Sequence, residues 1–158
     1  MSVDPSLFRA ALGRFASGVT VVTARDDDGR DVGMTVSAFS ALSLAPPLIL
    51  LCVDHGASVA PVLDRTMHFA VNILAADQEP ISRRFAEREV DRFDGVPFTR
   101  GRQGIPLLDG ALAHIECRTE ARHPGGDHTI LVGEVVATTV RDGEPLIYHR
   151  GGYGRWAQ

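Results

Sequence analysis

The sequence predicts a mainly β fold with flanking helices, in which an antiparallel sheet closes, or nearly closes, into a barrel. Short runs of β-branched and aliphatic residues recur along the chain and are joined by hairpin signals such as Asp28-Gly29 and Asp142-Gly143. The strands do not alternate regularly with long helices, which disfavours a βαβ repeat. The 158 residues, 44% of them hydrophobic, suffice for a single domain spanning residues 1–158.

The N-terminal half is expected to begin with a helix and continue as a hairpin. Asp4 followed by Pro5 is a typical helix start, and apolar residues at helical spacing follow. Gly18 is expected to end this helix. The strands expected in this half are residues 19–23, 32–36, 39–44 and 48–53. The last of these is continuously apolar, which is typical of a buried central strand.

The C-terminal half is expected to hold two short helices and the remaining strands. Ser58 can cap a helix that runs to Leu63, and residues 77–86 have helical periodicity. Residues 90–106 are rich in glycine and proline, and they predict a functional or mobile loop. The strands expected here are residues 68–73, 113–118, 129–140 and 146–148. The total is roughly seven short strands and about three helices.

Composition excludes several classes of function. All sixteen basic residues are Arg, and the net charge is −4, so a nucleic-acid partner, Schiff-base chemistry and a lysine-dependent phosphate loop are not expected. The start of the chain carries no secretory pattern, and the apolar stretch 41–53 is too short and broken to cross a membrane. Cys52 and Cys117 stand far apart, so we expect a reducing, cytoplasmic setting. No HExxH motif is present, and no metal site is expected.

Two segments could hold a cofactor. Residues 33–40 combine small side chains with hydroxyls beside the long apolar strand, which suits the edge of a flat heteroaromatic ligand, although an ordinary strand-to-turn segment has the same composition. Ser58 together with Arg83 and Arg84 could bind a phosphate. The alternative is that Ser58 only caps its helix and the arginines pair with acidic neighbours.

Two further segments could act on a second ligand. Gly125 and Gly126 place the pair Asp127-His128 on a bend, where a carboxylate can orient an imidazole for proton transfer or cofactor contact. A plain hairpin bend is the alternative. Residues 148–154 join aromatic, arginine and glycine residues, which suit nucleotide binding, or form a flexible tail.

Three motifs in order resemble the flavin reductase family with the FMN-binding split-barrel fold. They are residues 15–23 (FASGVTVVT), residues 33–40 followed by Ser43, Pro46 and Pro47, and Gly126-Asp127-His128 followed by Gly133. The resemblance runs from Phe8 to about Trp156. It implies a six-stranded Greek-key split β-barrel and a homodimer with flavin near the dimer interface.

The resemblance also assigns roles to individual residues. The flavin ring and ribityl chain would be lined by Met34, Thr35, Val36, Ser37 and Ala38 and bordered by Cys52, Val53 and Asp54. Its phosphate end would be held by Ser58, Val59, Arg84 and Phe85. NAD(P)H would contact His128, Tyr148, Arg150, Gly151, Gly152 and Tyr153, and the catalytic pair would be His128 and Asp127. Ala38 stands where many relatives carry a second serine, so one polar contact to the flavin is absent.

The function implied is an NAD(P)H-dependent reductase of FMN or FAD. Hydride would pass directly between nicotinamide and flavin, held by proximity and orientation, and reduced flavin would leave for a separate monooxygenase. The C-terminal segment has no basic cluster, which favours NADH, while Arg150 and Arg155 leave NADPH possible. The alternatives are a non-catalytic module that binds flavin, deazaflavin or haem, and an oxidase of a phosphate-bearing amine.

Overall fold

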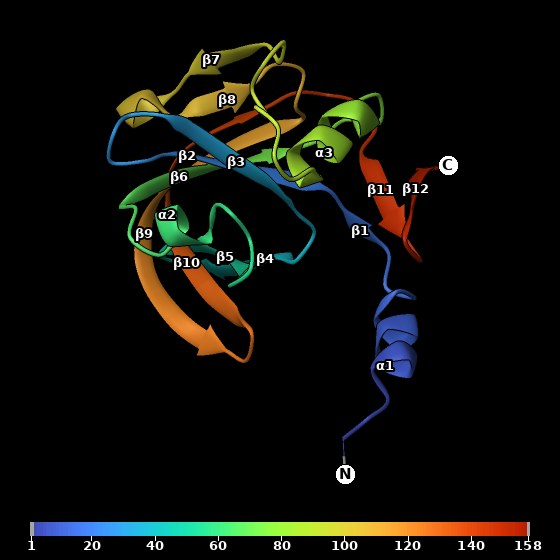
Figure 1. Cartoon of the computed structure of the whole chain (residues 1–158). Helices are drawn as coiled ribbons and strands as arrows, with labels where there is room; N and C mark the ends of the chain where they lie inside the picture. Colours follow the sequence, from blue (N-terminus) through green and yellow to red (C-terminus); the bar gives the residue numbers. More distant parts are fainter. Residues whose placement is uncertain (1, 158) are drawn as a thin grey trace.

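The computed structural model describes residues 2–157 (Figure 1). A long curved sheet forms the body, and α1 lies outside it, below the hairpin of β11 and β12. The helical elements are α1 (Pro5–Leu12), α2 (Ala60–Leu63), α3 (Glu79–Ala86) and the 3-10 turn η1 (Arg102–Gly104). The strands are β1 (Ser17–Gly18), β2 (Thr20–Arg25), β3 (Asp31–Val36), β4 (Phe39–Leu44), β5 (Pro47–Asp54), β6 (His68–Ile73), β7 (Phe98–Arg100), β8 (Pro106–Leu108), β9 (Ala113–Gly125), β10 (His128–Val140), β11 (Leu146–His149) and β12 (Gly152–Arg155).

The main sheet is antiparallel and curls into an open barrel. Its strand order is β3-β2-β6-β9-β10-β5-β4, so β3 and β4 are its two edges. Only residues 37 and 38 separate these edges in the sequence. A chain spans at most about 3.6 Å per residue, so Val36 and Phe39 are within about 11 Å of each other. The edges therefore come close without pairing, which gives the expected split barrel, with seven strands in the described sheet where the resemblance implied six.

Alternation along the strands fills the barrel interior. In β5, Ile49, Leu51 and Val53 are buried while the intervening residues are partly exposed, as period-two geometry requires. These side chains pack with Phe69 and Leu131 in the larger core cluster. A second cluster lies on the other face of β2, where α3 contributes Phe85 and β11 contributes Leu146. Because both of its faces are covered, β2 is buried along nearly its whole length.

Several expected boundaries were wrong. The first helix ends at Leu12 with Gly13 as its cap, so Phe15 and Gly18 lie beyond it. Helix α2 has Val59 as its N-cap and no side-chain capping bond, so the predicted capping role of Ser58 is not observed. The segment 90–106 is not wholly a loop, because β7 and η1 form within it.

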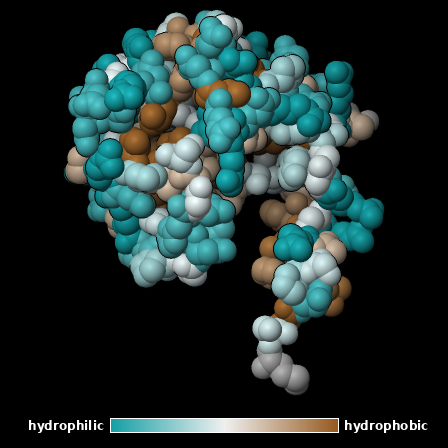
Figure 2. Space-filling model, in the orientation of Figure 1, coloured by the Kyte–Doolittle hydropathy of each residue, from teal (hydrophilic) through white to brown (hydrophobic). Residues whose placement is uncertain are grey.

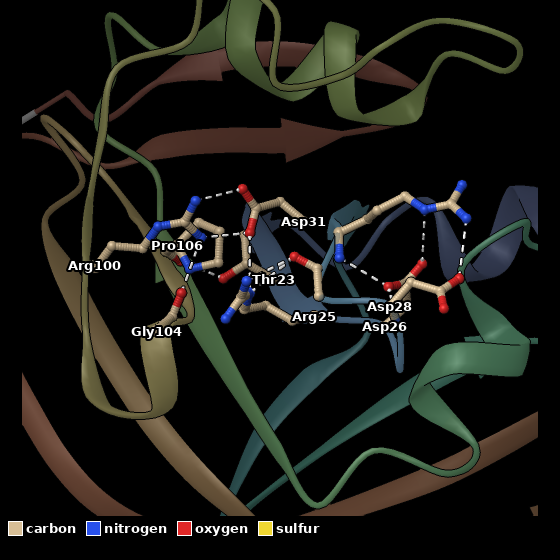
Figure 3. A network of polar contacts seen from close by, with 10 residues as sticks. Thr23, Arg25, Asp26, Asp28, Asp31, Arg100, Gly104 and Pro106 are labelled. Carbon is tan, nitrogen blue, oxygen red and sulfur yellow. Dashed lines mark hydrogen bonds and ion pairs between the residues drawn. The ribbon is translucent and has the colours of Figure 1, made fainter.

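Polar contacts hold the small β7–β8 hairpin on the barrel, as Figure 3 shows. The Arg100 guanidinium lies 2.9 Å from Oδ2 of Asp31 at the start of β3. The buried Thr23 hydroxyl donates to the carbonyl of Pro106, at 2.6 Å. Both contacts join residues about 70 or more positions apart, which explains why the local sequence did not predict this hairpin.

No helix within residues 2–157 has the length and apolar character needed to cross a membrane. The two cysteines are free. Over the same residues, no group of three or more His, Cys, Asp or Glu side chains is arranged to hold a metal ion.

Candidate functional site

A large hollow lies at the split of the barrel, between β4 and β5 on one side and the end of α1 with β11 on the other. Its volume is about 600 Å³. It is lined by Leu12, Gly13, Phe15, Ser17, Ser37, Ala38, Phe39, Ser40, Leu50, Cys52, Tyr148, His149 and Arg150. We call it the main hollow. Its walls are mainly apolar and aromatic, and the polar side chains on them include the serines Ser17, Ser37 and Ser40 together with His149 and Arg150.

The main hollow joins the two sets of ligand residues predicted from the sequence. Ser37, Ala38 and Cys52 come from the expected flavin set, and Tyr148 and Arg150 come from the expected nucleotide set. A main-chain hydrogen bond joins two residues of the flavin set, because the Cys52 N–H donates to the Ala38 carbonyl at 3.0 Å. Residues more than 90 positions apart therefore line the same hollow.

A smaller hollow of about 190 Å³ adjoins the main one, since Ser37 and Tyr148 line both. Thr35 reaches it, and its hydroxyl donates to the Ser82 carbonyl at 2.6 Å. The Ser82 hydroxyl in turn lies 2.7 Å from the Tyr153 hydroxyl. This chain of contacts ties β3, α3 and β12 together around the hollow.

Six residues of the expected flavin set, in the core or at the end of β5, do not line the main hollow. The side chains of Val36, Val53, Val59 and Phe85 are buried in the core, so a ligand could meet only their main-chain atoms. Met34 is partly buried against the same core. Asp54 is exposed at the end of β5, where its carboxylate accepts the Gly56 N–H at 2.7 Å.

The expected phosphate residues lie at a separate hollow or are engaged elsewhere. Ser58 and Val59 line a hollow of about 210 Å³ together with Gly33, Arg92 and Phe93. Arg84 donates through Nε to the carbonyl of Arg92 at 3.0 Å and through Nη2 to that of Asp91 at 2.7 Å. Its guanidinium therefore already holds the segment after α3.

Arg92 lines this second hollow and was not among the site residues expected from the sequence. It donates from Nη1 to the Gly33 carbonyl at 2.7 Å and from Nε to the Glu87 carbonyl at 2.9 Å. Burial lowers the pKa of Arg92 from its ordinary value. The sequence gives little indication of this role, because the residues around Arg92 do not predict a contact with Gly33 in β3.

Asp127 and His128 lie at the tip of the β9–β10 hairpin. The carboxylate of Asp127 accepts a hydrogen bond from Nδ1 of His128 at 2.7 Å. This bond is the main cause of the lowered pKa of Asp127, with the charge of His128 second and His55 a smaller contributor. The pair therefore presents a charged carboxylate and an imidazole whose Nε2 faces away from it.

The strand register relates this pair to the main hollow. His128 pairs with Asp54, and Ile130 pairs with Cys52. Cross-strand partners lie on the same face of a sheet, so His128 shares the outer face of β5 with Cys52. Two residues along a strand span about 7 Å, so His128 is placed beside the main hollow and does not line it.

Further lining residues were missed as ligand candidates. Phe15 and Ser17 were recognised only as part of a motif, and Leu50 was assigned to a buried strand. Period-two alternation along β5 could have placed Leu50 on the same face as Cys52.

Comparison with known proteins identifies this arrangement. The family described as "Flavin reductase like domain" matches residues 12–157. The FMN reductase (NADH) SmoA of Agrobacterium fabrum is 44% identical over 151 residues, covering 96% of this chain and 86% of that protein. The flavin-dependent monooxygenase reductase subunit HsaB of Rhodococcus jostii is 41% identical over 153 residues, covering 96% and 78%.

Solved structures agree. The NADH:FAD oxidoreductase SgcE6 of Streptomyces globisporus, in complex with NAD and FAD fragments, has a TM-score of 0.92 at 40% identity, covering 99% of this chain and 97% of that one. A Sinorhizobium meliloti protein has a TM-score of 0.94 at 38% identity, but this chain spans only 53% of its length. These matches confirm the split-barrel fold, and the chain belongs to the flavin reductase-like domain family.

Proposed function

We propose that this chain is an NADH-dependent flavin reductase that supplies reduced FMN or FAD to a separate flavin-dependent monooxygenase. The observation that carries the proposal is the main hollow, because three of the expected flavin residues, Ser37, Ala38 and Cys52, and two of the expected nucleotide residues, Tyr148 and Arg150, line the same space. The NADH-dependent relatives and the reductase subunit HsaB support both the electron donor and the separate partner.

The main hollow fits a flavin ring. Its volume of about 600 Å³ lies within the range of about 300–1,000 Å³ typical of small-molecule sites. Phe15, Phe39 and Tyr148 offer flat apolar surface, while Ser17 and Ser37 offer hydroxyls for a heteroaromatic edge. A bound flavin would supply the acceptor for the hydride of NADH.

The protein's own contribution is chiefly orientation. Ser37 and Ala38, held against Cys52, would fix one ligand, and Tyr148 and Arg150 would fix the other. Asp127 keeps the proton of His128 on Nδ1, so Nε2 is the nitrogen available to position the nicotinamide or to take part in protonation. We assign His128 and Asp127 this role in the reaction.

The test is NADH oxidation at 340 nm with no flavin, with FMN and with FAD, and with NADPH in place of NADH. Flavin-dependent oxidation is the expected result, and it also gives the cofactor preference. If flavin binds but NADH is not oxidised, the chain is a non-catalytic binding module. An absorbance spectrum of the purified protein separates haem from flavin.

We also propose that the chain acts as a homodimer. Helix α1 has no buried residue, and Leu7, Phe8 and Leu12 are all more than half exposed. Figure 2 shows apolar side chains along this helix, which stands apart from the body. An eight-residue helix is too short to be stable alone in water, so a covering surface is expected, and a second copy of the chain would supply it.

Light scattering after size-exclusion chromatography tests the dimer. The wild type should have twice the chain mass, and the double variant Leu7→Gln/Leu12→Gln should have the mass of one chain. Val140→Gln is the matched control, because it removes another exposed apolar side chain away from α1. A monomeric wild type would contradict the proposal.

We further propose a single domain over residues 1–158 and a cytoplasmic setting. The match of one family to residues 12–157 supports the first. The two free cysteines support the second, because reducing compartments keep thiols unpaired.

A further inference from the structure

A fourth hollow, which we call the arginine hollow, lies where the end of α1 meets the turn between β11 and β12. Its volume is about 360 Å³, and it is lined by Arg9, Ala10, Gly13, Arg14, Arg150 and Gly151. It adjoins the main hollow, since Gly13 and Arg150 line both. A ligand in the main hollow could therefore extend into it without leaving the surface.

Main-chain hydrogen bonds bring the three arginines together. The Arg150 N–H donates to the Gly13 carbonyl at 3.0 Å, and the Gly13 N–H donates to the Arg9 carbonyl at 2.9 Å. Arg14 follows Gly13 directly. The turn between β11 and β12 is thus fixed to the end of α1, although about 140 residues separate them.

The backbone at Arg150 is unusual for an arginine. His149 pairs with Gly152, so Arg150 and Gly151 form a two-residue hairpin turn, with φ of 52° and 79°. Turns of this kind favour Asn or Gly at both positions, because a side chain is strained at positive φ. Backbone strain of this sort is typical of functional sites. The placement of the guanidinium beside the arginine hollow is a reason for this turn position to be an arginine.

The arginine hollow has no negative charge of its own. Over residues 2–157, the ion pairs involve other arginines, such as Arg100 with Asp31 and Arg83 with Glu79, and none involves Arg9, Arg14 or Arg150. Arg9 lies in the last turn of α1, where a cation also favours the helix dipole. Arg14 and Arg150 lie beyond the helix, where that effect does not account for them.

We propose that Arg9, Arg14 and Arg150 bind a phosphate group of the nicotinamide dinucleotide. Guanidinium groups suit phosphate because they donate paired hydrogen bonds and stay charged. The proposal rests on the proposed reductase function, which places the nicotinamide end in the adjoining main hollow. The phosphate is either the pyrophosphate shared by NADH and NADPH or the 2′-phosphate of NADPH. The C-terminal segment has no basic cluster in its local sequence, and Arg9 of α1 together with Arg14 just after the helix would supply one.

The kinetic test compares Arg9→Gln/Arg14→Gln and Arg150→Asn with the wild type. Asn keeps the left-handed turn, and Gln keeps the helix. The control is Arg30→Gln/Arg102→Gln, which removes two exposed positive charges outside the four hollows described above. FMN is the acceptor throughout, so the dinucleotide is the only diphosphate present. Chain mass is measured for every variant, so that loss of a dimer is recognised.

The KM for the dinucleotide should rise about tenfold or more in both test variants, the loss expected for one charge-assisted hydrogen bond. The KM for FMN should not change in the test variants. The control variant should keep the wild-type KM for both the dinucleotide and FMN. A rise for NADH and NADPH alike identifies the pyrophosphate, and a rise for NADPH alone identifies the 2′-phosphate. Unchanged KM values for both dinucleotides, or a rise confined to FMN, would overturn the proposal.

Calorimetry separates this proposal from the reductase function. ADP and adenosine 2′,5′-bisphosphate are titrated into wild type and variants, with adenosine as the uncharged control. Weaker binding of either phosphate compound by the variants, relative to the wild type, supports the arginine hollow even if NADH is not oxidised. Equal binding by all variants refutes it even if the wild type is an active reductase.

Discussion

Replacing Gly133 by Ala is expected to crowd the interior of the barrel. Gly133 lies in β10, beside an irregularity in its pairing with β9. An added Cβ would stand 2.5 Å from Cζ of Phe69 and 2.9 Å from Cβ of Cys117, whereas apolar carbons rest about 3.5–4.0 Å apart. Phe69 and Cys117 are themselves buried, and Phe69 packs in the larger core cluster, so its ring can move away only by displacing other core side chains.

The magnitude follows from two opposing effects. Overpacking a well-packed core costs about 1–3 kcal/mol of unfolding free energy. Replacing glycine by alanine also restricts the unfolded chain, which stabilises the fold by about 0.4–1 kcal/mol. Gly18→Ala is a matched control, because its Cβ would meet nothing within 4 Å and its φ is not positive. The difference between the two variants therefore isolates the crowding, at about 1–3 kcal/mol.

Urea unfolding followed by circular dichroism measures this difference, at one protein concentration so that association is held constant. In thermal scans, Gly133→Ala should melt about 2–12 °C below Gly18→Ala, at about 2–4 °C per kcal/mol for a chain of this length. Equal stability of the two variants would refute the packing that the structure gives around Gly133.

Four further predictions concern the site and the core. His128→Ala should lower kcat for NADH oxidation with less effect on FMN affinity, measured by flavin fluorescence, and equal turnover would remove its assigned role. Maleimide labelling of Cys52, which lines the main hollow, should be slowed by FMN, and unchanged labelling would place the flavin elsewhere. Burial raises the pKa of Cys117 from 9.0 to about 12. The stabilisation by its protonated thiol is thus complete below pH 9.0 and lost as pH rises toward 12, and Cys117→Ala should flatten the unfolding free energy over that range. Asn72→Leu leaves the buried N–H of Leu108 without its acceptor and should cost about 1–3 kcal/mol in urea unfolding.

The sequence predicted the parts of the fold that local patterns determine. The β2–β3 hairpin follows from β-branched runs around an Asp-Gly turn, and the buried strand β5 follows from its continuous apolar run. The β7–β8 hairpin could not be predicted in this way, because the Arg100–Asp31 and Thr23–Pro106 contacts that hold it come from distant segments. The early end of α1 at Gly13 was missed because helical apolar spacing continues to Phe15.

The candidate site was predictable only where one segment carries several of its residues. Ser37, Ala38 and Cys52 were expected and do line the main hollow. Arg84 was expected at a phosphate, and the structure shows its guanidinium bonded to the carbonyls of Asp91 and Arg92. Secondary-structure propensity and residue spacing describe neighbours along the chain. They could not indicate that the end of α1 contacts the turn between β11 and β12.

The packing of the barrel explains where a ligand can bind and why it can leave. Inward-facing side chains such as Leu51, Phe69 and Leu131 fill the interior, so no flat ligand can enter the barrel itself. The available surface is the outer face of β5 next to the split, where Leu50 and Cys52 alternate with the core residues. A flavin bound there would lie between β4 and β5 on one side and the end of α1 with β11 on the other, at the surface of the barrel and outside its filled interior. Such a site suits a carrier that collects oxidised flavin and releases it reduced, and it would become enclosed only where a second copy covers it.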